Sequence, residues 1–304
     1  MGIGMQQSRI SRRSVGYLIA VVQAVFYSTM STFGKLLYEV GLTSAHVMIV
    51  RFLATTVLLA LFMLVFKRER FLSRNKSVYL QMVFFFLSAW FYFLTAQHLT
   101  AGLTTVIFYL FPAVVALINA LFFRERLSAL TVVALVLCIG GILVVSGEFT
   151  PGEHALDPLG ILFGFLSCLS FAVYTVLIQQ AGTPENSYTS TFTISVGCLV
   201  LSLIVFAPQV GGLVELSTPY VWGVGAAMAL LNTILPIILY IVAIKRIGGT
   251  EASLISIAET PFSLLFAYAL LGEVLTVWQA VGTIMIVAGI VLVTAEPLVK
   301  ARGA

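Results

Sequence analysis

The stretch that decides the fold is residues 92–145, YFLTAQHLTAGLTTVIFYLFPAVVALINALFFRERLSALTVVALVLCIGGILVV. Shifted by 148 residues, it aligns without a gap with residues 240–293, YIVAIKRIGGTEASLISIAETPFSLLFAYALLGEVLTVWQAVGTIMIVAGIVLV. Identical residues recur at aligned positions, among them Tyr92 with Tyr240, Glu125 with Glu273 and Gly141 with Gly289. Self-similarity at a fixed offset indicates that the chain contains two copies of one structural unit.

The composition identifies the solvent in which this unit folds. Of 304 residues, 60% are hydrophobic and 9% are charged, against roughly 45–50% and about 25% in soluble domains. The mean hydropathy is +1.09. So few polar residues cannot cover a surface that faces water, and we therefore expect an all-α integral membrane protein.

Apolar segments long enough to cross a bilayer, about 20 residues each, occur ten times. They are Gly16–Tyr38, Ser44–Phe66, Ser77–Gln97, Gly102–Phe123, Ala129–Gly147, Pro158–Gln179, Tyr188–Ala207, Tyr220–Ala243, Thr250–Leu271 and Thr276–Ala295. The sequence thus predicts ten transmembrane helices joined by short loops. The first segment follows several arginines, as a signal peptide does, but it is too long for one and no cleavage site follows it.

The distribution of basic residues predicts the orientation. All Lys and Arg residues except Lys35 and Arg51 lie in the tails or in the loops on the same side as the N-terminus. Loops rich in Lys and Arg stay in the cytoplasm. We therefore expect a multi-pass protein of the cytoplasmic membrane with both termini inside. The net charge of +4 then reflects topology and not binding to nucleic acid.

Each copy of the repeat contains five helices, residues 1–150 and 151–304. Because five is odd, the second copy must enter the membrane from the opposite face. A shift of 144 residues aligns the first helix of each copy and pairs Lys35 with Gln179. Inverted repeats are typical of secondary transporters, which bind their solute near the membrane midplane between the copies.

Several short motifs resemble the EamA-type drug/metabolite transporters. They are Arg51-Phe52, Leu110-Phe111-Pro112 followed by Arg124-Glu125-Arg126-Leu127-Ser128, and Glu259-Thr260-Pro261 followed by Gly272-Glu273-Val274-Leu275-Thr276. Arg124 departs from the pattern, because the family usually has glycine before this glutamate. The resemblance implies a ten-helix basket whose central cavity is lined mostly by helices 1, 3, 4, 6, 8 and 9. It also implies peripheral helices 5 and 10, and many bacterial relatives that export amino acids or other small metabolites.

Charged residues inside the membrane are the first candidate functional residues, because each costs roughly 2.5–3.5 kcal/mol at a helix centre. Arg51 lies about 10 Å below one end of its helix, and Glu259 lies about 14 Å deep. Glu259 is a candidate proton carrier or contact for a cationic group, and the alternative is a structural charge paired with Arg51. Arg51 is the more structural of the two. Lys35, one turn from a helix end, fits a side chain that reaches the headgroups.

Polar side chains at helical spacing form the second set of candidates. Such stripes either line a wet cavity or join helices through hydrogen bonds. The candidates for contact with the solute are Gln23, Tyr27, Tyr109, Asn119, Tyr174 and Asn232, together with Trp90 from the aromatic-rich third helix. Most other rings of that helix are expected to face lipid. Mid-helix prolines permit kinks, so Pro112, Pro236 and Pro261 are candidate hinges.

Other functional classes fit less well. An enzyme would need an acid/base pair, a nucleophile or a metal set, and His46, His98 and His154 have no partner at ligand spacing. No phosphate-binding loop is present, and Cys138, Cys168 and Cys198 all lie in apolar runs. We therefore expect no enzyme activity, cofactor or metal site. A channel would favour a repeated filter sequence, and none is evident.

The sequence therefore predicts a secondary transporter that works by alternating access. Its partners are a small organic solute and the lipid bilayer. Export of amino acids or related metabolites is the first choice, and efflux of lipophilic or quaternary cations is the alternative. Sugar-phosphate exchange fits less well, because a phosphate dianion would need several basic residues in the cavity. Protons are a candidate coupling ion, and a monomer and a dimer are equally open.

Overall fold

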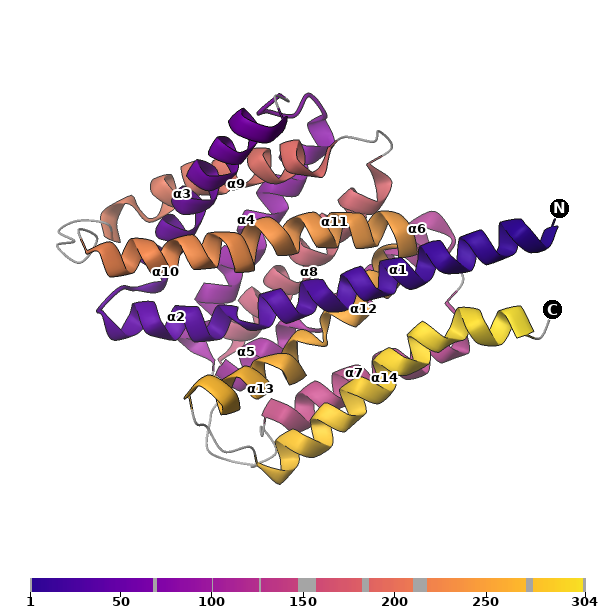
Figure 1. The fold of residues 1–304 in the computed structure, drawn as a ribbon. Helices are drawn as coiled ribbons and strands as arrows, with labels where there is room; N and C mark the ends of the chain where they lie inside the picture. The colour runs from indigo at the N-terminus through magenta and orange to yellow at the C-terminus, as the bar shows by residue number, and fades with distance from the viewer. Residues whose placement is uncertain are drawn as a thin grey trace.

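The fold was analysed in a computed structural model that describes residues 2–67, 70–99, 101–125, 127–146, 157–181, 186–209, 218–271 and 276–302. The described part of the chain is helical and contains no strand. Both termini lie at the same end of the bundle (Figure 1), which we call the termini end. All three cysteines are free and buried, in agreement with their place in apolar runs.

Helices occupy the expected segments to within a few residues at most ends. In the first half they are α1 (Gly2–Ser28), α2 (Met30–Glu39), α3 (Ser44–Phe62) with the π-helix η1 (Met63–Lys67), α4 (Lys76–His98), α5 (Ala101–Phe108), α6 (Phe111–Phe123) and α7 (Ala129–Ser146). In the second half they are α8 (Pro158–Gln180), α9 (Ser187–Val205), η2 (Ala207–Gln209), α10 (Pro219–Ala229), the π-helix η4 (Leu230–Ile234), α11 (Leu235–Ile247), α12 (Gly249–Ser256), α13 (Glu259–Leu271) and α14 (Val277–Arg302).

Nine helical stretches in the described residues are long and apolar enough to cross a membrane. The expected segment Thr250–Leu271 is not among them, and it is divided into α12 and α13. The expected helices Gly16–Tyr38 and Gly102–Phe123 are also interrupted, at Thr29 and at Tyr109–Leu110, so none of these three segments is one unbroken helix. The protein is an all-helical, multi-pass membrane protein.

Two of the interruptions lie just before prolines. The breaks at Tyr109–Leu110 and at Ile257–Ala258 each precede a proline, Pro112 and Pro261, by two to four residues. A proline has no N–H to donate one turn back, and its ring clashes with the carbonyl there. The half-helices correspond between the copies, since α5 and α6 shifted by 148 residues coincide with α12 and α13.

Short polar side chains fix where several helices begin. The side chains of Asn75, Asp157 and Asn186 accept hydrogen bonds from the backbone N–H groups two residues later, at 2.9, 2.9 and 3.2 Å. Each of these caps satisfies an N–H group that has no partner inside the helix. The caps explain why α4 and α9 begin one residue before the apolar segments do.

Helices α7 and α14 lie side by side at one edge of the bundle (Figure 1). Glycines allow their backbones to touch, because a Cβ added at Gly282 would lie 2.4 Å from the carbonyl oxygen of Gly141. Their outward side chains are apolar and exposed, such as Val136 and Ile284. This agrees with the peripheral position that the resemblance implies for helices 5 and 10.

The close approach of α7 and α14 makes a testable prediction. We expect Gly282→Ala to lower the free energy of unfolding by about 1–3 kcal/mol, because the added methyl group would push two backbones apart. Gly223 in α10 is the matched control, since a Cβ there meets nothing within 4 Å. Thermal unfolding in detergent checks both variants. Equal shifts for Gly282→Ala and Gly223→Ala would contradict this account of the packing.

Arg124 ends α6 in a left-handed backbone conformation, with φ 55° and ψ 27°. It is the one non-glycine residue with positive φ among the residues that the structure describes. This is the position where the resembling family usually has glycine, the residue that adopts this conformation without steric cost. The neighbouring Arg126 and the second copy of the motif, residues 272–275, lie outside the described residues.

The backbone of Arg124 makes a second prediction. Arg124→Gly should raise the free energy of unfolding by about 1 kcal/mol, because it removes the steric cost of a left-handed residue with a Cβ. Arg124→Ala removes the same charge but keeps the Cβ, so it separates charge from backbone geometry. Unfolding in detergent should show a higher midpoint for the glycine variant than for the alanine variant, and identical midpoints would refute the explanation.

Candidate functional site

Two broken helices bring Glu259 and Tyr109 together. Tyr109 lies in the turn between α5 and α6, and Glu259 is the first residue of α13. The Tyr109 hydroxyl donates a hydrogen bond to the Glu259 carboxylate. The breaks before Pro112 and Pro261 thus position the two side chains, and the sequence predicts both as candidates without pairing them.

Glu259 lies deep in the bundle yet is only partly covered. The side chain of Tyr27 is also deep in the bundle and only partly covered. Tyr27, Arg51 and Glu259 are close enough to interact electrostatically. A carboxylate in such surroundings strongly favours a positively charged partner. In the described residues no ion pair joins Glu259 to Arg51, and the Tyr109 hydroxyl is a group that stabilises the carboxylate.

A cluster of aromatic rings is connected to Tyr109 through Phe111, whose ring centroid lies 6.2 Å from that of Tyr109. Phe171 contacts Phe111, Tyr174 and Tyr240 at centroid distances of 4.7, 5.4 and 6.1 Å, and Phe85 contacts Tyr174 at 5.0 Å. Tyr174 is 1% exposed, and its hydroxyl has no hydrogen-bond partner in the described structure. A buried hydroxyl of this kind could bond a polar group of a solute.

The rings of α4 divide between the core and partly covered positions. Trp90 is half-buried and stacks on Phe91 at 6.0 Å. Phe85 and Phe86 are buried. The expectation that most rings of this helix face lipid was therefore wrong for these two, because α4 packs against α8 and turns them into the core.

Arg51 joins α3 to the distorted segment η4. Its Nε donates to Thr233 Oγ1 at 2.7 Å and its Nη2 to the carbonyl of Asn232 at 3.2 Å. Its Nη1 lies 3.6 Å from the sulfur of Met30. Asn232 is four residues before Pro236, which has no N–H to offer that carbonyl. Arg51, 4% exposed, therefore supplies the donor that the proline lacks.

Asn232 joins the same segment to a break in the first crossing. Its Nδ2 donates to the carbonyl of Phe26 and to Thr29 Oγ1, each at 2.8 Å, where α1 gives way to α2. In a similar way Gln23 of α1 accepts a hydrogen bond from Ser256 of α12 at 3.0 Å. Both side chains are buried and connect helices in this conformation.

The role of Arg51 can be tested by a double-mutant cycle. Arg51→Lys keeps the charge but cannot reach all three partners, so the free energy of unfolding should fall by about 1–3 kcal/mol. Pro236→Ala should recover part of this loss only in the Arg51→Lys background, because an alanine at that position restores an N–H that can serve the Asn232 carbonyl. Unfolding of the two single variants and the double variant gives the coupling, and strict additivity would disprove the compensation.

A polar cluster lies toward the termini end of the bundle. Asn119 Nδ2 of α6 donates to Gln179 Oε1 of α8 at 3.1 Å and to Thr250 Oγ1 of α12 at 3.0 Å. The backbone N–H of Gly249 also donates to Gln179 Oε1, at 2.7 Å. Sequence reasoning identified Asn119 but not Gln179 as a candidate. The only sequence feature that pointed to Gln179 was its alignment with Lys35 in the first copy, and Lys35 is exposed on α2.

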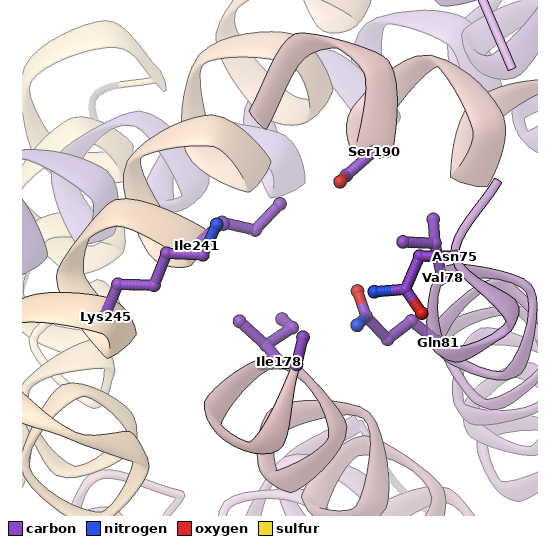
Figure 2. Close-up of a pocket in the computed structure, with 8 residues that line it drawn as sticks. Asn75, Val78, Gln81, Ile178, Ser190, Ile241 and Lys245 are labelled. Atoms are coloured by element: carbon purple, nitrogen blue, oxygen red, sulfur yellow. The ribbon is translucent and has the colours of Figure 1, made fainter. Parts of the chain in front are cut away.

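A small crevice opens beside this cluster between α4, α8, α9 and α11. Figure 2 shows Asn75, Gln81, Ser190 and Lys245 around it, together with four aliphatic side chains. Its volume of about 10 Å³ holds about one water molecule. It is therefore too small to be a solute site in this conformation.

His98 is not isolated, contrary to the sequence-based expectation. Its Nδ1 lies 2.7 Å from Oδ2 of Asp157, because α4 and α8 pack along their length and bring the two residues to one end. The Leu159 N–H and His98 together hold the pKa of Asp157 below its ordinary value. His46 bonds Thr43 at 2.8 Å, and His154 lies outside the described residues. Among the described residues no three His, Cys, Asp or Glu side chains could hold a metal ion.

The family model described as "EamA-like transporter family" matches residues 14–147 and 158–295. The chain belongs to the EamA-like transporter family. It is similar to uncharacterized transporters, including YxxF of Bacillus subtilis, which is 24% identical over 288 residues spanning 92% of this chain and 90% of that protein. A transporter of Archaeoglobus fulgidus is 27% identical over 70% of this chain and 74% of its own.

Two further comparisons agree with membership of the EamA-like family. The Salmonella typhimurium inner membrane transporter YicL is 27% identical over 70% of each chain. A crystal structure aligns with a TM-score of 0.75 and 17% identity, covering 93% of this chain and 98% of that one. At this identity the crystal structure shows the fold alone. Together with the family match, these findings make the protein a membrane transporter.

Proposed function

We propose that this EamA-like protein is a secondary transporter for small organic solutes that carry a positively charged nitrogen, with amino acids and related metabolites first. The observation that carries the proposal is the Glu259 carboxylate, bonded by Tyr109 at two facing helix breaks and only partly covered. A carboxylate at such a site attracts an ammonium group, and the ring of Tyr109 beside it adds cation–π attraction.

Transport by alternating access is supported by signs of an inverted repeat. The half-helices α5 and α6 correspond residue for residue to α12 and α13, and the family model matches two successive segments. With the broken segment counted as one crossing, the chain crosses ten times, and both termini lie at one end (Figure 1). With five crossings in each copy, the two copies would run in opposite directions, and the basic loops support cytoplasmic termini.

Amino acids are favoured because the same breaks also offer a place for a carboxylate. The N-terminal ends of α6 and α13 carry partial positive charge, and broken helices in transporters direct such ends at anionic groups of the solute. Arg51 does not serve this purpose, because Thr233, Asn232 and Met30 occupy its nitrogens. The same fact disfavours a phosphate dianion as the solute.

Efflux of lipophilic or quaternary cations is the second candidate. The observation that favours it is the aromatic surroundings of Tyr174 and Phe171, which suit a bulky apolar cation as well as an amino acid side chain. The two candidates differ in whether the solute needs a carboxylate. Coupling to protons fits both, because Glu259 could bind either a proton or the solute cation.

Counterflow of labelled solutes into liposomes that contain the purified protein tests the proposal. The panel should include neutral amino acids and quaternary amines at several pH values. Glu259→Gln should reduce uptake at least about tenfold, the loss expected from removing one charged hydrogen-bonding partner, and should abolish the pH dependence. Glu39→Gln is the control, since Glu39 is an exposed carboxylate at the end of α2.

The outcomes of the counterflow assay separate the candidates. Uptake of neutral amino acids, competed by unlabelled forms, would support the first candidate. Uptake of quaternary amines alone would support the second. Full transport by Glu259→Gln with an unchanged pH profile would show that the carboxylate is structural and would remove the basis of the proposal.

A further inference from the structure

We infer that Asn119, Gln179 and Thr250 form a polar latch that closes the transport path at the termini end and must open when solute passes there. The inference rests on the proposed function, because a latch has a role only in a protein that alternates its access. The three residues come from α6, α8 and α12, so the latch joins both halves of the chain. The transport step assigned to it is opening toward the cytoplasm.

Hydrogen bonds converge on the first residues of the half-helix α12. Gly249 donates its N–H to Gln179, and Thr250 accepts from Asn119, at 2.7 and 3.0 Å. The next residue, Glu251, accepts from Tyr17 at 2.6 Å and pairs with Arg13, both of α1. Three consecutive residues are therefore held by α8, α6 and α1.

Glycine is required for Gln179 to reach the start of α12. A Cβ added at Gly249 would lie 2.4 Å from Gln179 Oε1 and 3.3 Å from Thr175 Cγ2. The side chain of Asn119 is fully buried and Thr250 is nearly so. Gln179 is half-buried, so the latch lies between the three helices with its Gln179 side partly exposed.

One hydrogen-bond acceptor of the latch has no partner. Asn119 Nδ2 makes two hydrogen bonds, but Asn119 Oδ1 is buried without a partner in the described structure. A buried acceptor without a donor destabilises the state that contains it. Opening the latch would expose this oxygen to water, so the closed state is stable without being permanent.

Half-helix α12 connects the latch to the candidate solute site. It runs from Gly249 to Ser256, and the break at Ile257–Ala258 separates it from Glu259. A movement that releases the start of α12 therefore acts on the turn directly before the carboxylate. In this way occupation of the site and opening of the latch are mechanically linked.

The two ends of the molecule differ at aligned positions. Gln179 belongs to the latch, whereas Lys35, its counterpart in the first copy, is exposed. Two inverted copies in the same conformation would close both ends equally. The described latch contacts are therefore specific to the termini end, which we take as the closed end.

Hydrogen exchange followed by mass spectrometry tests the latch without a known solute. In the full-length protein in detergent, Gln179→Ala should speed exchange of the amides in α12 on the order of tenfold, the effect of losing one buried hydrogen bond. Gln180→Ala is the matched control, because Gln180 is the exposed neighbour on the same helix. Exchange in α7 and α14 should stay unchanged and reports that the variant is folded.

A conservative substitution distinguishes the latch from a general packing effect. Gln179 acts through an acceptor oxygen in both hydrogen bonds, and glutamate offers the same oxygen with a charge that strengthens such bonds. Gln179→Glu should therefore keep α12 protected. Equal exchange in Gln179→Ala, Gln180→Ala and the unchanged protein, or loss of protection in Gln179→Glu, would overturn the latch.

Labelling from one side of the membrane tests that the latch closes the path. Ser253 is fully buried and lies one turn beyond Thr250 in α12. In inside-out vesicles a membrane-impermeant maleimide should label Ser253→Cys at least about tenfold faster when Gln179→Ala is also present, and Gln180→Ala should have no such effect. Equal labelling rates would overturn the gating role. Neither readout requires transport, so absence of counterflow would count against the proposed function and leave the latch result standing.

Discussion

A chain that crosses lipid has no water to satisfy its backbone, so every helix break must find its own hydrogen-bond partners. The helices of this protein are interrupted at several places. At those places buried polar side chains bond the backbone groups that the interruption leaves without a partner. Asn232 serves the carbonyl of Phe26 where α1 ends. Arg51 serves the carbonyl of Asn232 itself, in the π-helix before Pro236. The need to satisfy these groups explains why costly residues are buried where they are.

The need to satisfy buried polar groups also separates structural from functional polar residues. Three buried side chains form hydrogen bonds with neighbouring helices: Arg51, Asn232 and Gln23. Glu259 and Tyr27 lie as deep in the bundle but are partly uncovered. Partial cover deep inside a protein means that the packing leaves part of the side chain for something else. This is a physical reason to assign solute contact to Glu259 and a packing role to Arg51.

Sequence reasoning succeeded where a single segment contains the information. The length of the apolar segments was enough to predict the helices, because the thickness of the bilayer determines how long a spanning helix must be. The free-energy cost of burying a charge was enough to single out Arg51 and Glu259. Partners could not be predicted, because they depend on tertiary packing. Nothing in the local sequence connects His98 to Asp157 or Gln179 to Gly249. The interruption of Thr250–Leu271 was also missed, although Pro261 marked the place where a carbonyl loses its donor.

The correspondence of half-helices has a consequence for the cycle of the protein. If α12 holds the termini end closed, then α5, its counterpart in the first copy, occupies the equivalent place at the opposite end. An inverted repeat lets each copy adopt the conformation of the other, which closes one end while it opens the other. The residues that close the second end need not be the same types, since Lys35 stands where Gln179 stands. In the proposed cycle, unequal residues at equivalent positions would make the two closed states differ in stability, and that difference would set which side of the membrane the empty transporter faces.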